Sequence, residues 1–305
     1  MSKERSSPLA TSVHQRLLTL SGKQGADFNL ILIRYGAERL LYRLSKSPYA
    51  MDFVLKGAML FTAWTGRSYR PTKDIDLLGF GDASSQRLAQ LFQAICSQEV
   101  EPDGMEFDAE SVQAAVIREG QEYEGHQVKL MGYLGNARIR VQIDIGFGDV
   151  VTPETEQMAY PTLLDFPAPR IRVYPRETVV AEKLQAMVAL GMPNSRMKDF
   201  YDLWMIARHF TFEGSILVEA IKATFDRRRT RVPEATPIAL SDEFAMDQDK
   251  RLQWKAFLKR NALENAAPDL AQIVHELRAF LMPPILAATR DETFHLSWTH
   301  GAPWS

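Results

Sequence analysis

Two aspartates, Asp74 and Asp76, interrupt an otherwise apolar segment that reads DIDLL. Side chains alternate between the faces of a strand, so both carboxylates would lie on one face, about 7 Å apart, while Ile75 and Leu77 point into the core. Carboxylates at that distance repel each other, and a divalent cation between them would relieve the repulsion. Mg²⁺ prefers oxygen ligands and commonly takes one or two carboxylates plus substrate phosphates. The alternative is a solvated strand end with two ordinary acidic residues.

A glycine turn precedes this pair. A short apolar run at 53–55 ends in Lys56-Gly57, and an apolar helical run follows at 58–64. Glycine lets the backbone approach a ligand closely, and the helix N-terminus beyond it suits a phosphate. After a polar turn at 65–72 the aspartate strand begins. A strand, a glycine turn, a helix and a strand with Asp-x-Asp form the layout of the nucleotidyltransferase fold.

Two signatures in the sequence resemble one family, the AbiEii/AbiGii-type nucleotidyltransferase toxins of the DNA polymerase β-like superfamily. The first is KGAML at 56–60 followed by RPTKDIDL at 70–77. The second is AEKLQA at 181–186, then a short loop and RMKDFYDLW at 196–204. The two signatures in this order are much more specific than either alone. One departure is Ala58, because the family often has Gly-Gly or Gly-Ser there, so a phosphate contact at this point must come from the backbone N–H.

The resemblance implies a role for each of these residues. Asp74 and Asp76 would hold Mg²⁺, and Lys183 would contact the triphosphate of the bound nucleotide. Asp199 or Asp202, three residues apart and so on one helix face, would complete the site as a general base or as a holder of Lys183. The residues expected to bind the nucleotide are Lys56, Gly57, Ala58, Thr72, Lys73 and Lys183.

In the superfamily that the two signatures resemble, a third carboxylate comes from a neighbouring strand of the same sheet. The segment 137–145 alternates strongly, which predicts a strand with Arg138, Arg140, Gln142 and Asp144 on one face. Plain amphipathicity explains the arginines, but aspartate is depleted in strands. Asp144 is therefore the preferred third metal ligand. Asp149 is the competing candidate, although its Gly-rich surroundings are typical of a turn.

Charge and composition limit the partners. The chain has 305 residues, a net charge of -2 and one cysteine, Cys96, which we expect to be structural. Binding to nucleic acid would need a local patch, and the candidate is the basic cluster at the end of a helix at 212–229. Cations also favour a helix C-terminus, so both interpretations remain open. The cluster consists of Arg227, Arg228, Arg229 and Arg231.

The hydrophobic periodicity predicts an α+β protein. The resemblance implies a nucleotidyltransferase-like N-terminal lobe with a mixed β-sheet at 1–165 and a helical C-terminal lobe at 166–305, with the active site between them. The proline-rich segment 153–175 would hold the boundary. The acidic segment 101–110 reads as a turn. A helix is predicted at 27–44, and its polar members are expected to form pairs on the helix surface: Arg34, Glu38, Arg39 and Arg43.

The function implied by the resemblance is a Mg²⁺-dependent nucleotidyltransferase. It would be the toxin of a toxin–antitoxin pair, would transfer a nucleotide from an NTP to an RNA acceptor such as tRNA, and would have a cognate antitoxin protein. The sequence shows neither a signal peptide nor an apolar run long enough to span a membrane, so the expected compartment is the cytoplasm. One alternative is nucleotidylation of a protein or small-molecule hydroxyl. Another is a non-catalytic binding module on the same fold.

Overall fold

The computed structural model describes residues 7–119, 123–290 and 292–305. Contacts within the chain define two units. The first contains Met1–Gly148 and Glu156–Val173, and the second contains Asp149–Thr155 and Tyr174–Ser305. The chain therefore passes between the units three times. The lobe boundary predicted after residue 165 lies inside the second segment of the first unit, and it remains a proposal about which parts fold on their own.

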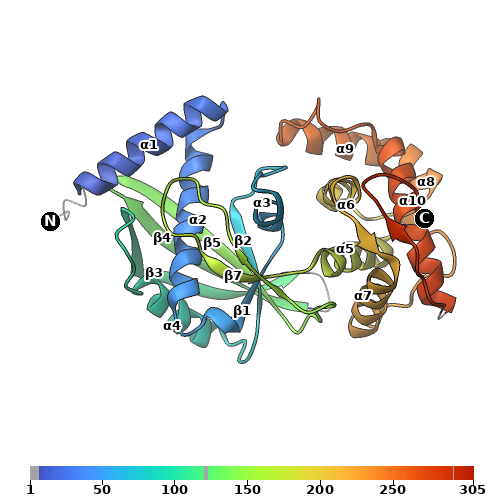
Figure 1. Cartoon of the computed structure of the whole chain (residues 1–305), viewed down its shortest axis with the longest axis horizontal. Coiled ribbons are helices and arrows are strands. Elements are labelled where there is room, and N and C mark those ends of the chain that lie inside the picture. Colours follow the sequence, from blue (N-terminus) through green and yellow to red (C-terminus); the bar gives the residue numbers. More distant parts are fainter. Residues whose placement is uncertain (1–6, 120–122, 291) are drawn as a thin grey trace. The chain divides into compact units, whose positions relative to one another are not determined.

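A seven-stranded mixed sheet forms the first unit, in the order β3-β4-β5-β2-β1-β7-β6 (Figure 1). β2 runs parallel to β5 and β1 runs parallel to β7, while the other neighbours are antiparallel. This confirms the predicted fold class. The strands are β1 (Phe53–Lys56), β2 (Asp74–Gly79), β3 (Met105–Glu119), β4 (Tyr123–Leu134), β5 (Ala137–Phe147), β6 (Glu156–Ala159) and β7 (Arg170–Val173).

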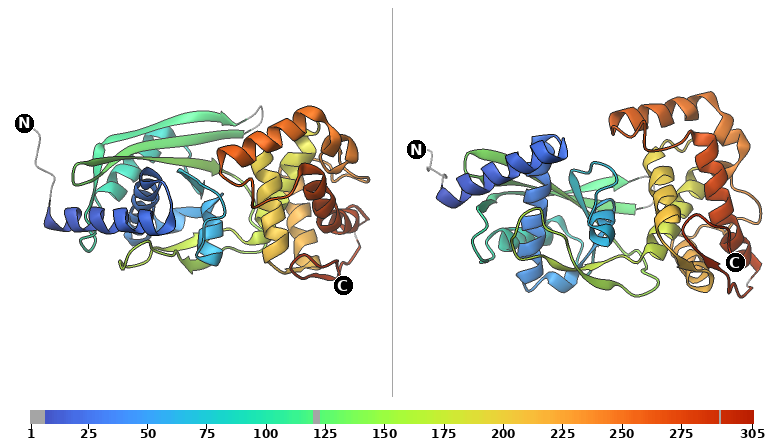
Figure 2. Two further views of the ribbon diagram at one scale, coloured as in Figure 1. Left: turned by 90° about the horizontal axis from the view of Figure 1, so that it is seen from above. Right: turned by 45° about the horizontal axis from the view of Figure 1, so that its top comes forward.

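Helices cover one face of this sheet (Figure 2). On α2 (Phe28–Lys46), a Cβ added to Gly36 would lie 2.9 Å from Ile139, so this helix packs closely on β5. On α4 (Ser85–Cys96), Phe92 contacts Phe53 of β1 with ring centroids 5.7 Å apart. Ile139 and Phe53 belong to the face that carries the buried apolar residues of β5 and β2. α1 (Pro8–Gln24) packs beside α2, and α3 (Met59–Thr65) follows the glycine turn after β1.

The polar residues of α2 correct the prediction of surface pairs. Glu38, Arg39 and Arg43 are buried, because α2 is covered on its outer side by the segment around 163–167 as well as by the sheet. Arg43 donates to both carboxylate oxygens of Asp103, at 2.8 and 3.2 Å. Arg39 donates to the Pro167 carbonyl at 3.0 Å and pairs with Glu38 at 2.8 Å. The hydrophobic periodicity predicted the helix correctly, but it could not predict that residues 163–167 cover the polar side of this helix.

The second unit is helical, as predicted. Buried apolar residues such as Leu184, Phe200, Leu217 and Phe280 form its core. None of the helices among the described residues has the length and apolar character needed to cross a membrane. The elements are α5 (Arg176–Leu190), α6 (Met197–His209), α7 (Gly214–Arg227), α8 (Asp242–Met246), α9 (Gln248–Arg260), α10 (Leu270–Arg290) and the short pair β8 (Phe212–Glu213) and β9 (Ser297–Trp298).

Two smaller predictions concern single segments. Cys96 is buried on α4, as expected for a structural cysteine, and burial raises the pKa of its thiol to about 12. The segment 101–110, predicted to be a turn, instead contains the start of β3 at Met105. An irregularity in the β3–β4 register between Asp108 and Gln113 breaks the alternation of side chains, so the sequence lacks a clear strand period here.

Candidate functional site

The first candidate cluster is a row of side chains across three neighbouring strands. Asp76 on β2 lies opposite Lys56 on β1 and opposite Asp144 on β5. Asp74 lies two residues earlier on the same strand, opposite Gln142. Adjacent strands are about 4.8 Å apart, so Asp76 and Asp144 are direct neighbours on one face. All three carboxylate residues are partly exposed, while Ile75 and Leu77, which point to the opposite face of β2, are buried. We call Asp74, Asp76 and Asp144 the acidic row.

Gly57 lies directly beneath this row. Its φ is +73°, a backbone conformation that side chains rarely adopt. A Cβ added here would lie 2.0 Å from Oδ2 of Asp76, 2.5 Å from Cγ and 2.7 Å from Cβ. No other residue type therefore fits beside the carboxylate of Asp76, and the glycine turn predicted from the sequence has a steric basis.

Asp144 and Asp149 differ sharply in their surroundings. Oδ1 of Asp144 accepts hydrogen bonds from the side-chain amides of Gln127, at 2.9 Å, and Gln142, at 3.3 Å. Asp149 belongs to the second unit, where its Oδ1 accepts from Arg228 at 2.9 Å. The structure thus places Asp144 beside Asp76 within the first unit, and it pairs Asp149 with Arg228 within the second. The sequence could not distinguish them by residue type, and the two glutamines that orient Asp144 carried no recognisable signal.

The remaining residues of the first signature lie around Asp74. A small cavity of about 20 Å³ is lined by Arg34, Thr72, Lys73, Asp74 and Tyr160, among others. Such a volume holds about one water molecule. The hydroxyl of Thr72 lies 3.4 Å from the backbone carbonyl of Asp74, while Lys73 is exposed. Ala58 is buried at the start of the turn into α3, so its side chain offers nothing to a ligand.

The carboxylates of the acidic row are hard oxygen donors, which suits a divalent cation. Among the residues that the structure describes, no group of three or more His, Cys, Asp or Glu side chains converges on a metal position. The donor set therefore fits a cation held by one or two carboxylates and completed by substrate oxygens, as Mg²⁺ often is. A site enclosed entirely by protein ligands does not fit these residues.

The second candidate cluster lies on α5 and α6 of the helical unit. Nζ of Lys183 donates to Oδ1 of Asp199 at 2.6 Å and to Oδ2 of Asp202 at 2.9 Å. Nε of Arg196 donates to the other oxygen of Asp199 at 2.7 Å. Both aspartates are 1% exposed, and the Lys183 side chain is 15% exposed. Lys183 is therefore not on a solvated helix face, which was the simpler interpretation of its place in the sequence.

The electrostatics of this cluster follow from burial and from the two cations. Burial alone would raise the pKa of Asp199, but the charges of Lys183 and Arg196 outweigh it and hold the pKa below its ordinary value. Asp199 also lies in the first turn of α6, where a negative charge interacts favourably with the helix dipole. Asp199 is consequently an ionised, weakly basic carboxylate. Arg196, which belongs to the second signature, is thus the second cation that binds Asp199, a role that the sequence did not indicate.

The four arginines at the C-terminal end of α7 do not form one surface. Arg228 is turned inward, with 17% of its side chain exposed, and binds Asp149, Glu182 and the side-chain carbonyl of Gln185. Arg227, Arg229 and Arg231 are exposed, and Arg231 pairs with Glu234 three residues later. The sequence offered no way to distinguish the inward arginine from its neighbours, because its partners come from residues 149–185.

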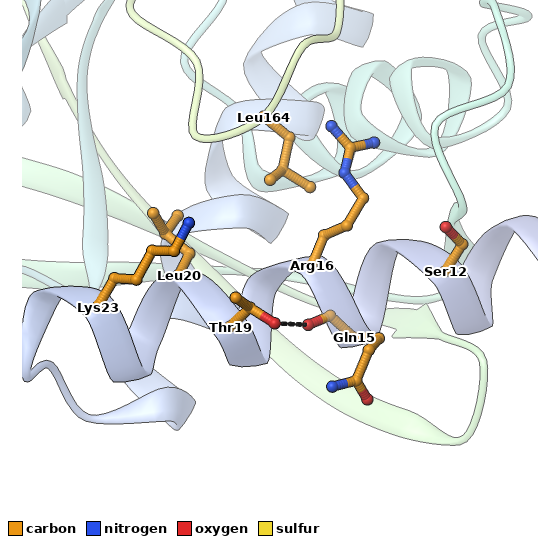
Figure 3. Close-up of a pocket in the computed structure, with 7 residues that line it drawn as sticks. All are labelled: Ser12, Gln15, Arg16, Thr19, Leu20, Lys23 and Leu164. Atoms are coloured by element: carbon orange, nitrogen blue, oxygen red, sulfur yellow. Dashed lines mark hydrogen bonds between the residues drawn. The ribbon is translucent and has the colours of Figure 1, made fainter.

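A larger hollow lies elsewhere on the first unit. It has a volume of about 490 Å³ and runs along α1, with Leu164 opposite the helix (Figure 3). Its polar lining comes from Ser12, Gln15, Arg16, Thr19 and Lys23. None of the predicted site residues lines it, so the hollow is separate from the acidic row.

A mixed sheet with a glycine turn beneath a row of carboxylates, followed by a helical unit, defines a nucleotidyltransferase. The chain belongs to the AbiEii family: the family described as "Nucleotidyl transferase AbiEii toxin, Type IV TA system" matches residues 39–276. It is thus a nucleotidyltransferase toxin of a type IV toxin–antitoxin system, a family that implies an NTP substrate, an antitoxin partner and a divalent metal. This confirms the resemblance drawn from the two signatures.

Two of the solved structures that this chain resembles come from Helicobacter pylori. One is the crystal structure of JHP933, at 15% identity and a TM-score of 0.46, over 93% of this chain and 95% of that chain. The other is described as a candidate nucleotidyltransferase, also at 15% identity and a TM-score of 0.46, over 94% of this chain and 98% of that chain. A comparison with curated proteins finds no match.

Proposed function

We propose that this toxin transfers a nucleotide from an NTP to an RNA acceptor such as tRNA, with Mg²⁺ as the divalent metal. The observation that carries the proposal is the register of Asp76 with Asp144, beside the glycine turn at Gly57. A reaction on tRNA takes place in the cytoplasm, which agrees with the compartment expected from the sequence.

The acidic row binds and orients the nucleotide in this proposal. Asp74, Asp76 and Asp144 supply the carboxylates, of which one or two at a time would hold Mg²⁺ together with phosphate oxygens of the NTP. Mg²⁺ bound by these residues would supply positive charge that offsets the charge on the phosphates and favours attack by a hydroxyl. Gly57 leaves room for the Asp76 carboxylate and lets the phosphates approach the backbone. Lys56, opposite Asp76, places a positive charge at the edge of the row.

Lys183 binds the phosphates of the nucleotide in this proposal, and the two aspartates position it. Asp199 is ionised, buried and bound to two cations, so it is a poor proton acceptor at neutral pH. This favours a positioning role for Asp199 over that of general base. Asp202, which also accepts from Lys183, shares that role.

Labelling identifies the reaction and its acceptor. Each labelled NTP is incubated with the protein, Mg²⁺ and either total RNA or total protein, and the product is separated. Label on RNA supports the proposal. Label on protein would replace the RNA acceptor with protein nucleotidylation, and absence of any transfer with all four NTPs would favour the non-catalytic module.

A matched pair of variants tests the acidic row itself. Asp144→Asn is expected to lower transfer by 10²-fold or more, as Asp74→Ala and Asp76→Ala are, because each removes an oxygen ligand. Asp149→Asn, which loses a pair with Arg228, is expected to keep full transfer once the variant is folded. Full activity in Asp144→Asn with loss in Asp149→Asn would reverse the assignment of the third carboxylate.

A test of the basic cluster at the end of α7 requires a variant that keeps Arg228, the member that points inward. Replacing Arg227, Arg229 and Arg231 with Gln, while keeping Arg228, removes the exposed charges without breaking the contacts to Asp149 and Glu182. If this cluster binds RNA, the affinity for tRNA falls and its salt dependence weakens. An unchanged affinity would show that the cluster is a helix end with no role in binding.

A further inference from the structure

An exposed face of the sheet adjoins the acidic row. Side chains alternate along β5, so Arg138 and Arg140 share a face with Gln142 and Asp144, and both arginines are exposed. On β4, the exposed Lys129 lies opposite Gln142 and therefore on this same face. The helices α2 and α4 pack on the other face. We call Lys129, Arg138 and Arg140 the basic track.

The track is continuous with the acidic row within one unit. Lys129 is level with Gln142, two residues from Asp144, which is roughly 7 Å along the strand. Arg140 lies roughly 13 Å from Asp144 and Arg138 roughly 20 Å, by the same rise per residue. The cations thus begin beside the carboxylates and lead away from them in steps of two residues.

The charges of the track are not neutralised within the protein. Among the residues that the structure describes, no hydrogen bond or ion pair involves the side chain of Lys129, Arg138 or Arg140. The nearest carboxylates on this face beyond β4 are Glu106 and Asp108 of β3, opposite Tyr133 and Met131. They are two strands away from Arg138 and Arg140, at roughly 10 Å. Asp108 is a diagonal neighbour of Lys129 on the adjacent strand, but the part of the chain that the structure describes has no ion pair between the two.

We propose that the basic track binds the phosphate backbone of the acceptor RNA and directs the acceptor toward the acidic row. The proposal rests on the RNA acceptor of the proposed function, and it assigns that RNA a surface and a path. Exposed, unpaired cations in a line are what a phosphate backbone needs, and they release counterions when it binds. The net charge of -2 makes such a local surface necessary.

A charge-matched pair of variants tests the track. The track variant replaces Lys129, Arg138 and Arg140 with Gln. The control variant replaces three exposed cations of α9 with Gln, namely Arg251, Lys255 and Lys259. Both variants lose three positive charges from exposed positions, so any general effect of net charge is the same in the two proteins. Thermal unfolding checks that each is folded, and binding of labelled NTP with Mg²⁺ checks the acidic row.

Affinity for bulk tRNA is then measured across a salt series. Three phosphate contacts make the logarithm of the affinity fall by about 2 to 2.7 for each tenfold rise in salt concentration. Between 50 and 200 mM salt, the tRNA affinity of the wild type should therefore fall roughly 20- to 40-fold more than that of the track variant. The control variant should keep the wild-type slope, and NTP binding should be unchanged in both variants.

The outcomes separate the track from the function on which it rests. If the wild type and the track variant bind tRNA with the same affinity and the same salt dependence, the proposed role of the track is wrong. It is also wrong if the control variant loses as much tRNA affinity as the track variant. Transfer of label to protein instead of RNA overturns the RNA acceptor even where the slopes differ. Weaker RNA labelling by the track variant, with a raised KM for tRNA and unchanged kcat, supports both.

Discussion

Gly57 provides the sharpest test of the acidic row, because its replacement moves one carboxylate without removing it. In Gly57→Ala the new methyl carbon would lie 2.0 Å from Oδ2 of Asp76 and 2.7 Å from its Cβ. Rotating the carboxylate relieves the first contact but not the second, so the Asp76 side chain and its backbone must shift. The position of a proposed metal ligand changes while every charge in the row is kept.

The expected magnitudes follow from two separate effects. An alanine at a φ of +73° costs about 1–2 kcal/mol in the left-handed region. Forcing Asp76 off its preferred rotamer adds about 0.5–1.5 kcal/mol. The free energy of unfolding should therefore fall by about 1.5–3.5 kcal/mol. Transfer should fall by about 10²-fold, since a misplacement of about 1 Å in a catalytic arrangement has that effect.

Gly66→Ala is the matched control. Gly66 has a φ of +72°, nearly the same as Gly57, but nothing lies within 4 Å of an added Cβ. The Gly66→Ala variant should lose only the stability that the left-handed backbone conformation costs an alanine, about 1–2 kcal/mol, and should keep its transfer activity. Urea unfolding measures both stabilities, and labelled NTP at saturating concentration measures both activities. Equal activity in the two variants would refute the placement of Asp76 at the reacting nucleotide.

Two predictions concern buried charges. Lys183→Met should lower the free energy of unfolding by about 3–5 kcal/mol at pH 7, because it removes the cation that the buried Asp199 and Asp202 share. The lowered pKa of Asp199 means that this stabilisation is present above its ordinary pKa of 3.8 and is lost as the pH falls below it, so urea unfolding should show the deficit shrinking below about pH 4. A deficit independent of pH would contradict the pairing. For Glu38, burial raises the pKa from 4.5 to about 7, so wild-type stability should fall by up to about 3 kcal/mol as the pH rises from 4.5 to 7. Glu38→Gln should lack that slope, and an unchanged slope would assign the pH dependence to another group.

Short sequence patterns correctly predicted features that depend only on the geometry of a single strand or helix. Side chains on a strand alternate between its two faces with a period of two residues. The alternation at 137–145 therefore predicted the face on which Asp144 lies, and the spacing of Asp74 and Asp76 predicted that these two share a face. The family signatures identified Lys183 and its two aspartates as a set. The structure brings that set together within one unit.

Features that depend on distant partners were not predictable in this way. Glu38, Arg39 and Arg43 lie on a helix whose polar side is covered by residues 163–167 and 103, far away in the sequence. Arg228 is one of three consecutive arginines, and the acids that turn it inward come from other elements. The pairing of Asp76 with Asp144 depends on a parallel register between β2 and β5, which neither strand encodes by itself.

The strand order has a consequence for how the protein is made. β1 lies between β2 and β7, and Leu55 pairs with Val173 although most of the first unit separates them along the chain. On the ribosome, β1 and β2 can form early, but the outer edge of β1 has no neighbour until residues 170–173 have emerged. An exposed edge strand is a site for pairing with other chains. The nascent toxin therefore carries an open sheet edge while residues 80–169 are made, and translation of β7 closes it.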